Sequence, residues 1–94
     1  MLLLPASLTM PVARDALRML SQALQREPES GIVVDASGLQ QLDSAALSVL
    51  LECQRLAQVW GKGFSVRRAP PKLLALAKLY GVDAVLPFEA AAAP

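Results

Sequence analysis

Residues 42–60 read LDSAALSVLLECQRLAQVW, and this stretch decides the fold of the chain. Asp43 and Ser44 carry side-chain oxygens that can accept hydrogen bonds from the free N–H groups of a first helical turn. We therefore expect one of them to cap a helix that begins at Ser44, give or take one residue. Gly61 tolerates positive φ and stands where a helix commonly ends. The apolar residues between these signals recur every three or four positions, as on a largely buried helix; they are Leu47, Leu50, Leu51, Cys53, Leu56, Ala57 and Trp60.

The segments around this helix alternate between strand and helix patterns. Ile32–Val34 is a β-branched run that precedes a turn, which is typical of a buried central strand. In chain order we expect a strand over Leu2–Leu4, a helix from Pro11 that ends before Glu27, the strand Ile32–Val34, the helix from Ser44, a strand over Phe64–Arg67, a helix over Pro71–Tyr80 and a strand over Val85–Phe88. This order predicts an α/β layered domain with about four mostly parallel strands and three main helices.

Length and composition set further bounds. Ninety-four residues, 54% of them apolar, suffice for a single hydrophobic core, so we expect one domain over residues 1–89 and a disordered tail over 90–94. Cys53 falls on the apolar helix face and is expected to be a buried hydrophobe, and a lone cysteine fits a reducing cytoplasm. The opening Met-Leu-Leu-Leu is too short for a signal peptide or a membrane span. A net charge of +1 with scattered basic residues argues against nucleic acid as a partner.

Most enzymatic chemistry lacks its residues in this chain. There is no histidine, which excludes His-based metal sites, Ser-His-Asp hydrolysis and imidazole acid–base catalysis. Gly61–Gly63 lacks the spacing of a phosphate-binding loop, and Ser44 lies in no Gly-x-Ser-x-Gly elbow. Asp35 and Asp43 could pair around a metal, but turn and capping roles are favoured for two isolated aspartates. The sequence therefore predicts a non-enzymatic protein without a cofactor or a metal.

Two sets of residues resemble a known family. Residues 32–39, IVVDASGL, followed by 42–47, LDSAAL, are similar to the signature of STAS domains, the family of anti-sigma factor antagonists. The resemblance implies that Ser44 holds the regulatory, often phosphorylated position, while Ala46 replaces the usual glycine two residues further on. Residues 76–82, LAKLYGV, and 85–87, VLP, more specifically resemble MlaB-type STAS domains, the cytoplasmic subunits of phospholipid-transporting Mla ABC systems.

The resemblance begins near Leu2 and lacks the first strand of the family. Leu2–Leu4 would then correspond to the family's second strand and leave a more exposed sheet edge. An unpaired edge is a pairing hazard or a docking site. A bare interaction module that homodimerises through this edge is therefore one expectation.

A partner site is expected at the carboxyl ends of the strands, beside helix N-termini. The resemblance implies that this end binds the ATPase of an inner-membrane ABC transporter for phospholipid, which would place the chain in the cytoplasm, attached to the membrane through partner subunits. The expected partner-binding residues are Ser37, Gly38, Gln40, Gln41, Asp43 and Ser44. ATP and lipid would be handled by partner subunits.

Other interpretations of the same residues stay open. The alternative function is a switch of the anti-sigma factor antagonist type, in which a partner kinase phosphorylates Ser44. Capping preference alone also explains a serine at that position. Glu52 and Arg55 either extend the partner contact or form an ordinary solvated face, and the solvated face is favoured for a charge pair at this spacing.

Overall fold

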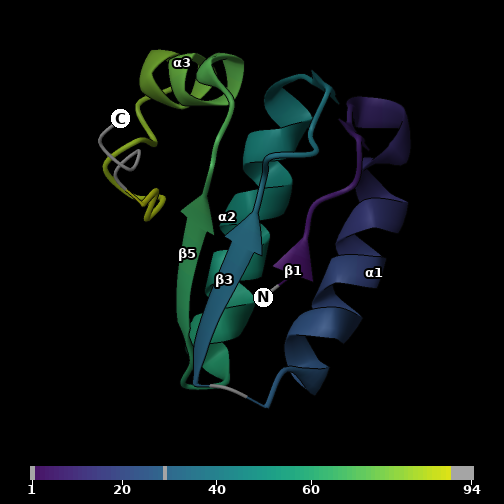
Figure 1. The fold of residues 1–94 in the computed structure, drawn as a ribbon, viewed down its shortest axis with the longest axis vertical. Helices are drawn as coiled ribbons and strands as arrows, with labels where there is room; N and C mark the ends of the chain where they lie inside the picture. The colour runs from purple at the N-terminus through teal and green to yellow at the C-terminus, as the bar shows by residue number, and fades with distance from the viewer. Residues whose placement is uncertain (1, 29, 90–94) are drawn as a thin grey trace.

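The computed structural model describes residues 2–28 and 30–89, so the expected tail over 90–94 lies outside the described residues. Figure 1 shows the elements in two layers. In chain order they are β1 (Leu2–Leu3), β2 (Ser7–Leu8), a 3-10 helix (Met10–Val12), α1 (Ala13–Arg26), β3 (Gly31–Asp35), β4 (Gln41–Leu42), α2 (Ser44–Val59), β5 (Gly63–Arg67) and α3 (Pro71–Leu79). None of the helices in this described part is long and apolar enough to cross a membrane.

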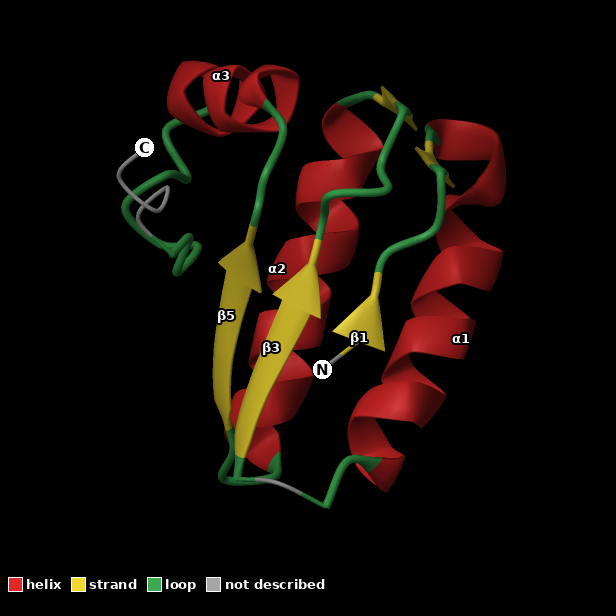
Figure 2. Cartoon of the chain, in the orientation of Figure 1, coloured by secondary structure: helices red, strands yellow, loops and turns green. Residues whose placement is uncertain are grey.

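The strands pair in parallel throughout. The main sheet has the order β1-β3-β5, and β3 pairs with β5 from Gly31 opposite Gly63 to Asp35 opposite Arg67. α1 and α2 form the crossovers between these strands, and Figure 2 shows both helices behind one face of the sheet. β2 and β4 form a second parallel pair beyond the carboxyl ends of the main strands. The predicted α/β layered domain with parallel pairing is confirmed.

The core forms between α2, the sheet and the two other helices. α2 contacts α1, β5 and α3, which is why its apolar residues are buried on several sides. Its buried residues are Ala45, Ala46, Leu47, Val49, Leu50, Cys53 and Ala57. Burial raises the pKa of the Cys53 thiol to about 12, so this thiol stays protonated and unreactive at neutral pH, as its apolar position predicted.

The last predicted strand, Val85–Phe88, is wrong. The N–H groups of Val85 and Leu86 donate to the carbonyl of Val82, at 3.0 and 2.9 Å, so the chain turns there instead of extending. Only Phe88 forms a bridge, with Val66 of β5. Pro87 has no N–H to donate to a ladder, which limits the pairing of this segment.

The other differences concern short elements at the carboxyl end of the sheet. The expected helix from Pro11 begins as a 3-10 turn, and its α-helical part starts at Ala13. β2 and β4 were not predicted, since two-residue strands carry no alternation that a sequence could display. Within the described residues β1 pairs only with β3, so its other side is an open edge, and dimerisation through it stays a prediction.

The turn after α2 also holds the C-terminus of α1. Gly61 has φ of 69°, the left-handed conformation expected of a residue just past a helix end. The next residue, Lys62, donates from Nζ to the carbonyl of Leu24 at 3.2 Å and to that of Glu27. These are carbonyls at the negative end of the α1 dipole, so the ammonium group satisfies them and stabilises the helix end.

Lys62→Met should therefore lower the free energy of unfolding by about 1 kcal/mol, because it keeps the length of the side chain but removes the charge and its hydrogen bonds. Urea denaturation measures this loss. Lys62→Arg is the control, since it keeps a cation with several donors. Equal stability of Lys62→Met and wild type would show that the contact contributes nothing.

Candidate functional site

Asp43 is the cap of α2, and it also holds the segment that begins α1. Its Oδ1 accepts a hydrogen bond from the N–H of Ala45 at 2.8 Å, and its Oδ2 accepts one from the N–H of Met10 at 3.0 Å. One carboxylate thus satisfies free donors at two helix starts. The predicted start of the helix at Ser44 is confirmed, and Ser44 is its first residue, not its cap.

Asp43→Ala should lower the free energy of unfolding by about 2 kcal/mol, the upper end of the range for a lost cap, because two N–H groups lose their acceptor. Ser44→Ala should change it by less than about 0.5 kcal/mol, as for a surface position without a structural contact. Thermal unfolding of both variants, with Asp43→Asn as a control that keeps an acceptor, checks this ranking. A larger loss for Ser44→Ala than for Asp43→Ala would mean that Ser44 is the cap.

The fold itself does not engage the hydroxyl group of Ser44. The side chain is half-buried, yet it makes no hydrogen bond within the described part of the chain, and no side-chain oxygen there is both buried and unpaired. Ser44 lies at one end of a shallow cleft of about 310 Å³ between α2 and the end of α3. The other lining residues are Leu47, Ser48, Leu51, Tyr80 and Val82, so no charged side chain lines the cleft.

Exposed apolar side chains continue from this cleft along the end of α3 and the turn after it. Tyr80 is 58% exposed, and its neighbour Leu79 is 76% exposed. Val85, from the turn after α3, is 57% exposed, and its carbonyl accepts a hydrogen bond from Nε2 of Gln54 at 3.0 Å. The α2–α3 side of the molecule is therefore more apolar than the polar rim that the sequence predicted.

The turn after β3 is ordered by Asp35. Its side chain is 4% exposed, and its Oδ1 accepts a hydrogen bond from the N–H of Ser37 at 2.8 Å. Hydrogen bonds from Ser37, followed by the charges of Arg68 and Arg67, hold the pKa of the Asp35 carboxyl below its ordinary value, although burial opposes them. Asp35 is thus an ionised turn residue, which is the role favoured from the sequence.

The six predicted partner-binding residues lie along one connection, from the turn after β3 to the start of α2. Ser37, Gly38, Gln40 and Gln41 are exposed, and the N–H groups of Gln40 and Gln41 both donate to the carbonyl of Ala6. Asp43 is engaged by the two helix starts. Only Ser44 reaches the cleft, so the site divides into a polar rim after β3 and an apolar cleft beside α2.

The cleft was missed because it depends on tertiary packing. Its residues come from two segments about thirty positions apart in the chain, at 44–51 and 80–82. The one available signal was Tyr80, a large side chain directly before the glycine that ends α3. Glu52 and Arg55 pair with each other, with Arg55 Nε 3.1 Å from both carboxylate oxygens, as on an ordinary solvated helix face.

No metal-binding group of three or more His, Cys, Asp or Glu side chains occurs in the described ranges. Asp35 and Asp43, the two aspartates considered for a metal, serve the turn and the cap.

Comparisons with known proteins agree with this architecture. The family model described as "Mlab, STAS domain" matches residues 1–87. The solved structure of the anti-sigma factor antagonist SpoIIAA in its unphosphorylated form matches with a TM-score of 0.70 at 14% identity, over 94% of this chain and 76% of that one. No curated protein sequence matches the chain. The chain belongs to the STAS domain family and is most like its MlaB-type members.

Proposed function

We propose that this STAS domain is a non-catalytic subunit that binds and supports the ATPase of an inner-membrane ABC transporter for phospholipid. The observation that carries the proposal is the free hydroxyl of Ser44 at the end of an uncharged cleft. A partner side chain that enters the cleft would contact Leu47, Leu51 and Tyr80 and would pass directly over Ser44. The size and charge of residue 44 would then decide whether the partner fits.

The exposed surface around the cleft supports a protein partner. Leu79, Tyr80 and Val85 are all more than half exposed, and apolar side chains that cluster on a surface mark protein contacts more often than solvated faces. The polar rim formed by Ser37, Gly38, Gln40 and Gln41 would adjoin this apolar centre on one side, and an apolar centre with polar residues at its margin is the usual composition of a protein interface. In this arrangement Asp43 orders the helix start and contributes only indirectly.

Lipid and ATP would be bound by other subunits of the complex. The domain would work in the cytoplasm and reach the inner membrane only through its partner. Affinity purification of the tagged chain from its native cells, followed by mass spectrometry, tests the proposal. Co-elution of an ABC ATPase is the expected result, and co-elution of a sigma-regulating kinase without an ATPase would contradict it.

The second candidate is a phosphorylation switch of the anti-sigma factor antagonist type. It is favoured by one observation, the unbonded hydroxyl of Ser44 at the first position of α2. A phosphate there would carry about −1.5 to −2 charges at the positive end of the helix dipole, where the fold would tolerate it. A kinase would then control the same surface that the first proposal assigns to static docking.

A further inference from the structure

Arg68 has an unusual backbone conformation for its residue type. Its φ is 56°, and it is the one non-glycine residue with positive φ among those that the structure describes. A residue with a Cβ atom is sterically disfavoured in this left-handed backbone conformation, whereas glycine adopts it freely. The position would therefore suit glycine on backbone grounds alone, and the arginine side chain calls for a separate explanation.

The guanidinium group of Arg68 is held near Asp35, but its N–H groups remain available to donate hydrogen bonds. Its Nη1 lies 3.8 Å from Oδ2 of Asp35, close enough for charge attraction but too long for a hydrogen bond. The Arg68 side chain is 62% exposed and makes no hydrogen bond to another described residue. The carboxylate of Asp35 is held in place by a hydrogen bond from the N–H of Ser37. Its charge therefore attracts Arg68 toward a fixed position.

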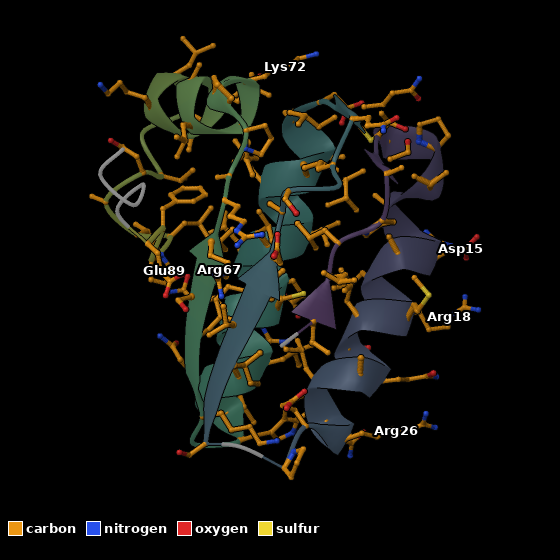
Figure 3. The ribbon with its side chains drawn as sticks, viewed as in Figure 1. Asp15, Arg18, Arg26, Arg67, Lys72 and Glu89 are labelled. Carbon is orange, nitrogen blue, oxygen red and sulfur yellow. The ribbon has the colours of Figure 1, made fainter. Side chains whose placement is uncertain are left out.

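The position of Arg68 connects it to the proposed docking surface. It follows β5, whose last residue, Arg67, accepts a hydrogen bond at its carbonyl from the N–H of Ala36 at 2.9 Å. Ala36 directly precedes the Ser37–Gly38 turn of the polar rim. Arg68 thus stands at the carboxyl edge of the sheet beside that rim, whereas Arg67 points to the flank of β5 where Glu89 lies (Figure 3).

None of the residues that line the cleft or form the polar rim is a cation. No charged residue lines the cleft, and Asp43, the one ionisable residue among the six predicted contacts, is occupied by two N–H groups. We infer that Arg68 is a specificity-determining contact of the docking surface and binds a side-chain carboxylate of the ATPase. This inference rests on the proposed function. The planar guanidinium offers several donors in a fork that matches a carboxylate, so it would select a partner with an acidic residue facing the rim.

The test measures the dissociation constant between the purified chain and the ABC ATPase that co-purifies with it, at low and at high salt. Arg68→Gly should bind about tenfold more weakly at low salt and lose part of the salt dependence, since one charged contact is removed. Its thermal midpoint should stay close to that of wild type, because the steric strain that glycine relieves at positive φ offsets the loss of the charge beside Asp35. Arg68→Glu should weaken binding further by placing like charges opposite each other.

Arg26→Glu is the matched control, since it makes the same charge change on an exposed residue at the far end of α1 (Figure 3). It should bind within about twofold of wild type. Wild-type affinity of both Arg68 variants, with Ser44→Leu unable to bind, would overturn the inference and leave the proposed function standing. Wild-type affinity of Arg68 and Ser44 variants alike, or the recovery of no ATPase, would overturn both.

Discussion

Leu50→Ala is expected to lower the free energy of unfolding by about 2–5 kcal/mol, the range for removing a fully buried leucine side chain. Leu50 is 0% exposed on α2, the helix that packs between α1, β5 and α3. The loss combines the burial of the removed methyl groups with the cavity left among neighbours that can only partly collapse. For a domain of this size it is a large part of the total stability.

Urea denaturation measures the effect, with Val59→Ala as the control on the same helix. Val59 is 67% exposed, so its truncation should change the stability by less than about 0.5 kcal/mol. The midpoint should fall for Leu50→Ala while the slope of the transition stays the same. Equal midpoints for the two variants would mean that this face of α2 does not form the core.

The sequence predicted best where local signals and burial agree. α2 begins at Ser44 as expected because the Asp43 cap precedes an apolar periodicity that the core then uses. β3 is two residues longer than the predicted Ile32–Val34, and β5 is one residue longer than the predicted Phe64–Arg67. Both were predicted because their patterns of apolar residues agree with the burial of each strand. Val85–Phe88 has the composition of a strand, but local hydrogen bonds to Val82 favour a turn.

The candidate site could be predicted only in part. Sequence alone left both Asp43 and Ser44 as possible caps, and no local pattern could show that Met10, thirty-three positions from Asp43, donates to the second oxygen of its carboxylate. The cleft requires α3 to pack against α2, which no local pattern encodes. Arg68 carried no signal, because an arginine after a strand gives no indication of a left-handed conformation.

The second large effect is expected at Ser44. Ser44→Glu should leave the domain folded, because a carboxylate is favourable by about 0.3–1 kcal/mol in the first turn of a helix. It should nevertheless reduce complex formation with the ATPase by at least about tenfold, since the added charge would be buried against an uncharged cleft. Circular dichroism verifies the fold, and calorimetry with the purified ATPase measures the affinity. Ser48→Glu, one turn further along the same cleft, shows how far the effect extends.

Wild-type affinity for both Ser44→Glu and a bulky Ser44→Leu would place the interface on another surface. A weakened complex fits both functions, because phosphorylation would act on the same residue that static docking uses. The two differ in what cells contain. A switch requires a populated form of the chain that is heavier by one phosphate, together with a kinase, whereas static docking requires unmodified Ser44 in the assembled complex, since a dianion at the cleft would oppose docking. Intact-mass measurement of protein from its native host decides: a substantial phosphorylated species would contradict static docking as the main function, and unmodified protein bound to an ABC ATPase would contradict the switch.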